Sequence, residues 1–309
     1  MREPAKIRTG CKINLFLNIC SLREDGYHEL QTLFYPLSMP FDDLHILPVQ
    51  DEKCCLHLNC PALPSLASER TTLHKALEAF NSATGLRCSY EVLLRKQVPA
   101  GAGLGGGSAN AAGFLKYLNE RAGERGLSEE KLLQLAVKVG ADVPFFLMNK
   151  PALAEGIGDR LVPAEISLAG SCLVLVCPGV HVSTPWAYKE WDSLAGRGEV
   201  LENNLHAYFY RCLTSEGLTG RNSASGSPAV MAYSSWPWFY NNLEQAVFPG
   251  FPEIAAIKEK LIWAGARAAL MSGSGSSVFG IFENEESARK AAEDISFREY
   301  RTIVQILTV

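Results

Sequence analysis

The chain has 309 residues, of which 47% are hydrophobic and 20% charged, and its formal net charge is −4. This is the composition of a soluble globular protein with one large domain or two of ordinary size. Without a basic excess, the chain is not expected to bind nucleic acid or an anionic membrane. Hydrophobic runs such as residues 172–177 are too short to span a bilayer, so no membrane partner is expected.

The amino terminus and the cysteines indicate the compartment. The opening segment MREPAKIR lacks the hydrophobic stretch of a signal peptide. The nine cysteines are an odd number and are scattered, as in proteins of the reducing cytosol, so we expect a cytoplasmic protein. One group superficially resembles a set of zinc ligands, but no second pair of ligands follows, and an ordinary strand is the favoured interpretation; the group is Cys54, Cys55, His57 and Cys60.

The first half of the chain carries both strand and helix patterns. Residues 12–19 alternate, which predicts a strand with one face on a core and one face carrying polar groups. The first face holds Ile13, Leu15, Leu17 and Ile19, and the second holds Lys12, Asn14, Phe16 and Asn18. Another strand is expected at about 89–95, and a helix over 110–119 follows it after a glycine-rich stretch. Ser128 is a typical N-cap for a further helix, which ends at Gly140.

The second half mixes strands and helices in a way that predicts an α+β lobe. Strands are expected at about 171–177, 267–271, 278–282 and 301–307. Helices are expected from about Ser183, over 253–264, and from Asn284 to 295. Residues 214–235 are rich in Ser, Gly and Thr, which favours a long surface loop.

The glycine-rich stretch VPAGAGLGGGSANAAGFL, residues 98–115, holds five glycines between Gly101 and Gly107. It follows a predicted strand and opens a predicted helix. Glycine allows a close backbone approach, and a helix N-terminus offers free N–H groups and partial positive charge, so the stretch can hold a phosphate. The spacing fits neither a Walker A loop nor a dinucleotide fingerprint, and a flexible structural loop is the alternative.

Three further features are ambiguous when considered singly. A second glycine turn, residues 272–276, lies between two predicted strands and could be an ordinary hairpin loop or a closure over phosphates. Lys12 could be a solvated charge on a strand edge, and Asp142 could cap the segment that follows it. If both faced one hydroxyl, they would form a pair for phosphoryl transfer, in which the carboxylate takes the proton and the ammonium stabilises charge.

Taken together, four blocks resemble the GHMP small-molecule kinases, the family of galactokinase, homoserine kinase, mevalonate kinase and phosphomevalonate kinase. The blocks are KINLFLNICSLREDGYHELQTLF (12–34), VPAGAGLGGGSANAA (98–112), GADVPFFL (140–147) and ALMSGSGSSVFGIF (269–282). They appear in the family's order and span almost the whole chain. The shorter segments PGVHVSTPWAYK (178–189) and NNLE (241–244) also fit.

The resemblance implies a two-lobed α+β fold. Residues 1–160 are expected to form the N-terminal ATP-binding lobe, which is similar to ribosomal protein S5 domain 2. Residues 161–309 are expected to form a ferredoxin-like C-terminal lobe, with a loop insertion near 196–235. The protein is expected to be a monomer or a homodimer.

The resemblance also implies the site. Asp142 is expected to be the general base, and Lys12 to lie near the transferred phosphoryl group. ATP is expected to contact Lys96, Pro99, Gly101, Gly103, Leu104, Gly105, Gly106, Gly107, Ser108 and Asn110. The acceptor is expected to contact Asn14, Tyr27, His28, Thr184, Pro185, Tyr188, Gly273 and Ser274. Mg²⁺ is the expected cofactor beside ATP, with Ser108 as a candidate ligand only.

The acceptor implied by the resemblance is a cytidine diphosphate-linked methylerythritol. Tyr27 would stack on the cytosine, His28 would hydrogen-bond its edge, and Tyr188 would complete the aromatic sandwich. Packing of Tyr188 on its own helix is the alternative. Other acceptors (mevalonate, homoserine or a sugar) and a non-catalytic nucleotide-binding role remain alternatives. The chain departs from the family in three places: Ala102 stands where another glycine is common, Thr71–Thr72 replaces a common Asn-Leu near the adenosine, and Asn242 replaces a common Asp.

Overall fold

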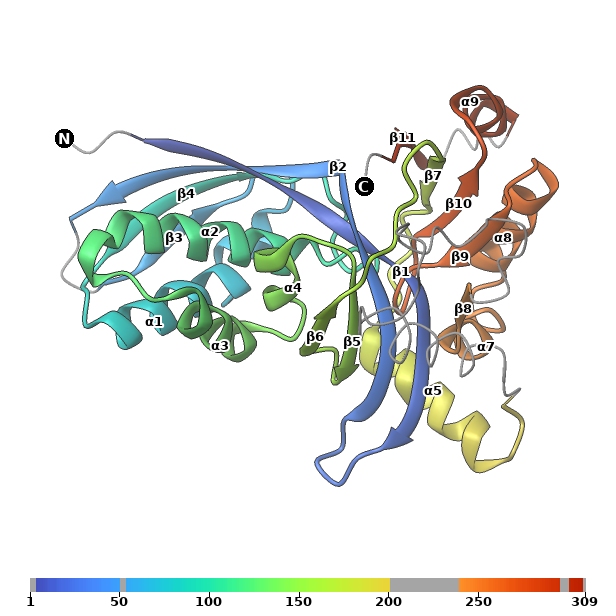
Figure 1. Cartoon of the computed structure of the whole chain (residues 1–309), viewed down its shortest axis with the longest axis horizontal. Coiled ribbons are helices and arrows are strands. Elements are labelled where there is room, and N and C mark those ends of the chain that lie inside the picture. The colour runs from blue at the N-terminus through green and yellow to red at the C-terminus, as the bar shows by residue number, and fades with distance from the viewer. Residues whose placement is uncertain (1–3, 51–53, 201–238, 295–299, 308–309) are drawn as a thin grey trace, which may run out of the picture.

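A long antiparallel pair of strands runs through the molecule (Figure 1). The computed structural model describes residues 4–50, 54–200, 239–294 and 300–307. Strand β1 (Ala5–Leu22) pairs along its length with β2 (His28–Val49). The strand predicted for residues 12–19 therefore forms, within β1.

The predicted division of this strand into two regular faces is wrong. The register of β1 shifts between Asn14 and Phe16, where an extra residue opposes β2. A bulge of this kind interrupts the two-residue alternation of side chains. Phe16 therefore joins Ile13 in one hydrophobic cluster, whereas Leu17 joins another and lines a cavity.

The first sheet has the order β3-β4-β2-β1-β8, and β5 extends it by pairing with β2 and β6. The added strands are β3 (Leu56–Asn59), β4 (Ser89–Arg95), β5 (Ala152–Gly156), β6 (Arg160–Pro163) and β8 (Tyr240–Asn241). The strand predicted at 89–95 is confirmed as β4. The short β8, which comes from late in the chain, lies parallel to β1.

The helices between β3 and β5 in the chain lie beneath the first sheet in Figure 1. They are α1 (Thr72–Thr84), α2 (Gly106–Ala122), α3 (Glu129–Val139) and α4 (Val143–Met148), and short 3₁₀ turns follow β3 and α2 at Pro64–Ala67 and Gly123–Arg125. As predicted, Ser128 caps α3, where its Oγ accepts a hydrogen bond from the Lys131 amide at 3.4 Å, and Gly140 follows the last turn. Buried aromatic residues such as Phe80 and Phe114 fill the core between helices and sheet.

The second sheet has the order β11-β7-β10-β9. Its strands are β7 (Cys172–Cys177), β9 (Ala268–Met271), β10 (Val278–Phe282) and β11 (Arg301–Ile306). Helices α8 (Pro252–Trp263) and α9 (Glu285–Asp294) pack on this sheet, while α5 (Thr184–Gly196) packs on α7 (Leu243–Val247). The strands and helices predicted for the second half thus form close to the expected positions.

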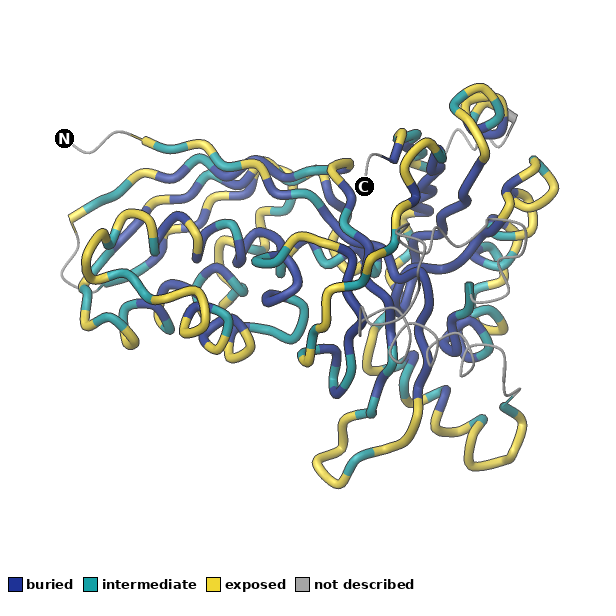
Figure 2. Tube along the Cα trace, in the orientation of Figure 1, coloured by how far each residue is buried: buried dark blue, intermediate teal, exposed yellow. Residues whose placement is uncertain are grey.

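The two sheets share a buried core. Ile13 and Phe16 of β1 pack with Leu175 of β7 and Phe279 of β10. Figure 2 shows this junction as the place where buried segments of both sheets meet. The two-lobed α+β expectation matches this architecture. The predicted boundary at residue 160 stays a prediction, and most of the loop expected at 196–235 lies outside the described residues.

Within the described parts of the chain, no helix combines the length and the hydropathy needed to cross a membrane.

Candidate active site

One cavity of about 870 Å³ collects residues from both sequence halves. It lies where β1, the glycine-rich stretch, α5 and the second glycine turn come together. All the residues proposed for the site from sequence line it, namely Lys12, Asn14, Tyr27, His28, Lys96, Pro99, Gly101, Gly103, Leu104, Gly105, Gly106, Gly107, Ser108, Asn110, Asp142, Thr184, Pro185, Tyr188, Gly273 and Ser274.

The glycine-rich stretch forms a loop that ends at the N-terminus of α2. Gly103 and Gly105 have φ of 75° and 69°, a left-handed conformation that favours glycine. A Cβ at Gly105 would also lie only 3.2 Å from the Cγ of Lys12. The amide of Lys12 donates a hydrogen bond to the carbonyl oxygen of Leu104 at 2.9 Å, which fastens the loop to β1. The loop can therefore offer amides and the positive end of a helix to an anion.

The second glycine turn contacts this loop directly. A Cβ added to Gly103 would lie 1.9 Å from the carbonyl oxygen of Ser272, so only glycine fits between the two turns. The Ser272 hydroxyl donates to the carbonyl oxygen of Gly103 at 3.0 Å, and the Ser277 amide donates to that of Ala102 at 3.3 Å. The turn joins β9 to β10 as a hairpin, and it also closes one wall of the cavity.

The NNLE segment positions this second turn. The Asn241 side-chain amide donates to the carbonyl oxygens of Met271 and Gly273 at 2.8 and 2.7 Å. Asn242 Oδ1 accepts a hydrogen bond from the Ile19 amide at 2.7 Å, so the segment also holds β1. These contacts are structural, and they explain why asparagine at position 242 is compatible with the fold.

Lys12 is buried, so its interpretation as a solvated edge charge is wrong. Its Nζ donates to Asn14 Oδ1 at 2.6 Å, and Asn14 Nδ2 donates to Thr32 Oγ1 at 2.8 Å. The Thr32 hydroxyl donates in turn to the carbonyl oxygen of Phe16 at 2.6 Å, which fixes the orientation of the whole chain of groups. Burial lowers the pKa of Lys12 below its ordinary value, and nearby Asp142 opposes that shift.

Asp142 faces Lys12 and does not cap the amides of α4 (Val143–Met148), although it holds the N-cap position. The capping interpretation is therefore wrong. Its Oδ2 lies 3.9 Å from Lys12 Nζ, and its side chain is 31% exposed. This distance is too long for a hydrogen bond, so the two side chains do not bind each other directly. Both line the cavity, and the space between them is open to a ligand. A hydroxyl placed there could contact both.

Asp42, which the sequence analysis did not single out, anchors the base of the glycine-rich loop. It is fully buried on β2. Its carboxylate accepts from Lys96 Nζ at 2.7 Å, from the Gln97 and Val98 amides at 2.6 and 2.8 Å, and from Asn110 Nδ2 at 3.0 Å. Lys96 and Asn110, both expected near ATP, are thus held by one carboxylate.

The far end of the cavity carries aromatic groups. Tyr27 is 60% exposed at the tip of the β1–β2 hairpin. The His28 ring stacks on Tyr188 with a centroid distance of 4.8 Å and an interplanar angle of 27°, and its Nε2 lies 2.7 Å from Asp192 Oδ1. Burial raises the pKa of the Tyr188 hydroxyl, and Asp142 adds to that shift. Tyr188 faces the cavity from α5, and sequence reasoning missed Asp192 on the same helix.

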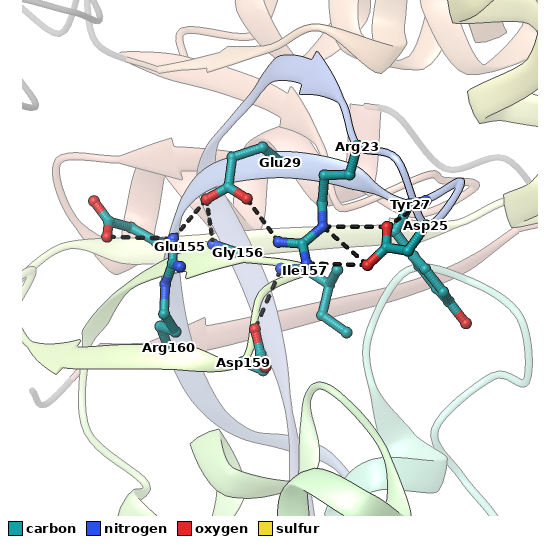
Figure 3. Close-up of polar contacts among 9 residues, drawn as sticks. All are labelled: Arg23, Asp25, Tyr27, Glu29, Glu155, Gly156, Ile157, Asp159 and Arg160. Carbon is teal, nitrogen blue, oxygen red and sulfur yellow. Dashed lines mark hydrogen bonds and ion pairs between the residues drawn. The ribbon is translucent and has the colours of Figure 1, made fainter.

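An ionic network braces the hairpin tip (Figure 3). Arg23 donates to Asp25 and to Glu29, and Asp25 accepts from the Tyr27 amide at 3.1 Å. Glu29 also accepts from the Gly156 amide at 3.1 Å and from Arg160 at 2.5 Å. Hydrogen bonding from Arg23 holds the pKa of Glu29 below its usual range. The network ties the segment that carries Tyr27 to the β5–β6 turn.

A hydrophobic region borders the glycine-rich loop on the side of α1. Leucines from separate segments line the cavity there, beside Thr71 and Thr72; they are Leu58, Leu66, Leu73 and Leu94. The Thr72 hydroxyl donates to the carbonyl oxygen of Gly107 at 2.8 Å. A flat nucleobase fits a hydrophobic wall of this kind, although no single leucine could have been identified from sequence.

The cysteine cluster lies away from the cavity. Cys55 Sγ is 3.3 Å from His57 Nε2. The strand interpretation is confirmed only for His57, which belongs to β3 (Leu56–Asn59), whereas Cys54, Cys55 and Cys60 lie just outside that strand. Across the described ranges, no group of three or more His, Cys, Asp or Glu residues could hold a metal ion.

Comparison with known proteins identifies the class. Residues 71–150 match the family model for the GHMP kinases N terminal domain, and residues 228–301 match that for the GHMP kinases C terminal domain. The chain belongs to the GHMP kinase family and is an ATP-dependent phosphotransferase that acts on small molecules.

Individual relatives make the resemblance more specific. The chain is 43% identical to the 4-diphosphocytidyl-2-C-methyl-D-erythritol kinase of Oleidesulfovibrio alaskensis, over 92% of this chain and 93% of that protein. It is 41% identical to the protein of the same name from Nitratidesulfovibrio vulgaris, over 99% of this chain and 100% of the relative. A crystal structure of 4-(cytidine 5'-diphospho)-2C-methyl-D-erythritol kinase superimposes with a TM-score of 0.73 at 32% identity, covering 99% of this chain and 100% of that one. Homoserine kinase from Cytophaga hutchinsonii, with a TM-score of 0.66 at 19% identity over 98% of this chain and 95% of that one, shares the fold.

Proposed function

We propose that this chain transfers the γ-phosphoryl group of ATP to the 2-hydroxyl of 4-diphosphocytidyl-2-C-methyl-D-erythritol, producing the 2-phosphate and ADP. This is a step in the non-mevalonate synthesis of isoprenoid precursors. The names of the full-length relatives support the choice of acceptor. The observation that carries the proposal is a single cavity with a glycine-rich anion cradle, a buried lysine facing an aspartate, and a histidine with two tyrosines. The scattered cysteines support a cytoplasmic location.

The glycine-rich loop is proposed to hold the phosphates of ATP. Its amides and the N-terminus of α2 (Gly106–Ala122) supply hydrogen-bond donors and partial positive charge. Lys96, held by Asp42, adds a positive charge at the same edge of the cavity. The leucines near Thr71 and Thr72 would then border the adenine.

Lys12 and Asp142 are proposed to perform the chemistry. Asp142 would accept the proton of the 2-hydroxyl while the hydroxyl oxygen attacks the γ-phosphorus of ATP. The bond from that phosphorus to the β–γ bridging oxygen would break, and ADP would leave. Lys12 would stabilise the negative charge on the transferred group, and its hydrogen bond to Asn14 would keep the ammonium in place. Because Lys12 is buried, water screens its charge weakly.

Magnesium is expected to arrive with the nucleotide. Mg²⁺ commonly binds through substrate phosphates and one or two protein oxygens, and it neutralises phosphate charge. Ser108, near the start of α2, and Asp142 both line the cavity, and their oxygens would be ligands for such an ion. These two donors fit such a bound ion, although they would not form a binding site by themselves.

The aromatic end is proposed to bind the cytidine. Tyr27 and Tyr188 would contact the faces of the base, and His28 its edge. The stacking of Tyr188 on His28 supports a preformed wall at this end.

The decisive experiment measures ADP release with ATP and each acceptor in turn. We expect turnover with the cytidine diphosphate-linked methylerythritol and background rates with mevalonate, homoserine and sugars. Turnover with one of those instead would establish a different acceptor, and no turnover with any of them would favour a non-catalytic role.

The Asp142→Asn variant tests the proposed base. We expect kcat to fall by about 10²–10⁴-fold, the usual contribution of a general base, while the Kd for ATP stays unchanged. Wild-type turnover in this variant would exclude Asp142 as the base.

A further inference from the structure

Helix α5 holds the His28 ring with two residues one helical turn apart. Thr184, Tyr188 and Asp192 follow one another at intervals of four residues and so lie on one face of the helix, and all three line the cavity. Tyr188 covers a face of the His28 ring, with centroids 4.8 Å apart. Asp192 Oδ1 lies 2.7 Å from the Nε2 atom of the same ring. One face and one edge of His28 are therefore fixed by α5.

The chemistry of this contact determines where the ring carries its hydrogen. An ionised carboxylate can only accept hydrogen bonds, so Nε2 must be the donor in the contact with Asp192. In a neutral imidazole with its hydrogen on Nε2, the other nitrogen, Nδ1, is an acceptor. The partner that binds one ring nitrogen thus selects the role of the other, as it does for histidines that bind metals.

Neighbouring residues hold the contact between His28 and Asp192 in place. The side chain of His28 is only 9% exposed, whereas that of Asp192 is 43% exposed, so the ring rather than the carboxylate faces the interior. Trp191, next to Asp192, is buried in a hydrophobic cluster with Val174 of β7 and Leu243 of α7. Thr184 Oγ1 lies 2.8 Å from Ser274 Oγ, which ties the start of α5 to the second glycine turn. The helix therefore brings Asp192 to His28 from a fixed position.

We propose that Asp192 holds His28 in the Nε2–H tautomer and thereby makes the site prefer cytosine over uracil. This inference rests on the proposed function, in which His28 contacts the edge of the base. Cytosine presents an amino donor at the position where uracil, like thymine, presents a carbonyl acceptor. An Nδ1 acceptor pairs with the amino group and opposes the carbonyl. Asp192 is a positioning residue in this scheme, since it acts through His28.

The first test compares the binding of CDP and UDP by calorimetry in the wild type and in Asp192→Asn. The asparagine side chain has the same shape, but it can donate as well as accept, so it permits both tautomers of His28. We expect the wild type to prefer CDP and the variant to lose about tenfold of that preference, the equivalent of one hydrogen bond. The control is Glu190→Gln on the same helix, which makes the same change of charge and should keep the wild-type ratio.

The second test measures the tautomer itself. Ring nitrogen shifts of ¹⁵N-histidine-labelled protein, with the His28 signals assigned by their loss in His28→Asn, should show hydrogen on Nε2 in the wild type and a mixture of tautomers in Asp192→Asn. A hydrogen on Nδ1 in the wild type, or both nitrogens protonated at the assay pH, would overturn the proposal. An altered fold in the variant would not by itself produce this specific exchange of nitrogen signals.

The experiments distinguish a wrong acceptor from a wrong role for Asp192. If the wild type releases no ADP in response to the cytidine substrate, the proposed function is wrong. If the wild type is active and prefers CDP, but Asp192→Asn keeps the same CDP-to-UDP ratio, only the role of Asp192 is wrong.

Discussion

Removal of the Asp42 carboxylate should weaken the fold and the proposed ATP site together. Asp42 is fully buried, and it accepts hydrogen bonds from Lys96, from two consecutive backbone amides and from Asn110. Three of these donors lie just before the glycines of the loop, and Asn110 lies near the start of α2, which follows the loop. An Asp42→Ala substitution therefore removes a contact on each side of the loop. The same substitution leaves the Lys96 charge, with a side chain only 10% exposed, without its carboxylate.

The size of the effect follows from burial. Loss of one partner of a buried ion pair costs about 3–5 kcal/mol. The Val98 amide is buried and would lose its acceptor, at about 1–3 kcal/mol, whereas the exposed Gln97 can turn to water. Partial relaxation reduces the sum, so we expect Asp42→Ala to lower the free energy of unfolding by about 4 kcal/mol.

The neighbouring residue supplies the matched control. Asp43 pairs with Lys6 and Arg8, whose side chains are 51% and 57% exposed. Ion pairs with such exposed partners contribute about 0–1 kcal/mol, so Asp43→Ala should have a small effect. Urea unfolding of both variants measures the difference. Steady-state kinetics should show a raised KM for ATP in Asp42→Ala, with a smaller change in the KM for the acceptor.

Equal destabilisation by Asp42→Ala and Asp43→Ala would refute the reasoning, since it would mean that burial of the Asp42 network adds nothing. An unchanged KM for ATP in a folded Asp42→Ala variant would separate the network from the nucleotide site.

Three further predictions concern the cavity. Because burial lowers the pKa of Lys12 in the free enzyme and the ammonium is the active form, kcat/KM for ATP should fall on the alkaline side at a pH below the ordinary lysine value of about 10.4; a limb at or above that value would contradict the role of burial. Gly103→Ala should destabilise the protein and raise the KM for ATP, because the added Cβ would collide with the Ser272 carbonyl oxygen. Gly85→Ala is the control for backbone strain: Gly85 has a similar positive φ, but a Cβ there would meet no atom of the described residues within 4 Å. Glu29→Gln should raise the KM for the cytidine substrate more than that for ATP, because it weakens the network behind the hairpin tip; equal changes in both would indicate a general loss of structure.

The sequence predicts best where local signals suffice. Ser128 and Gly140 bracket α3 because capping chemistry acts within one helical turn. The glycines of 101–107 predict a loop that a phosphate can approach, and this stays a prediction; the structure adds that Gly103 makes room for the second glycine turn. The resemblance in four blocks brought in Lys12 and Asp142, whose individual patterns were compatible with ordinary structural roles.

Strand β2 shows the limit of local reasoning. Its 22 residues include Pro36, Pro40 and Pro48 as well as Asp42–Asp43, all of which disfavour a strand by local rules. The strand forms because it pairs with β1, β4 and β5, and the buried Asp42 is accommodated because its donors come from 54 to 68 positions away in the chain. No local pattern could reveal these partners.

Asp192 was missed for a related reason. The spacing of Thr184, Tyr188 and Asp192 can be read from the sequence, but it has many meanings on a surface helix. Its significance depends on His28, which lies 164 positions earlier in the chain. Only the folded arrangement assigns a partner to the carboxylate.

The position of β1 makes the two parts of the chain depend on one another for folding. Its residues pack both in the core between the two sheets and in the core formed by the second sheet and its helices. Strand β8, which comes from late in the chain, also pairs with it. A cut near residue 160 would remove β8 and the partners of Leu17, leaving a hydrophobic strand edge exposed to other chains. The enzyme is therefore a single cooperative unit despite its two sheets, and neither half is expected to survive as an independent nucleotide-binding module.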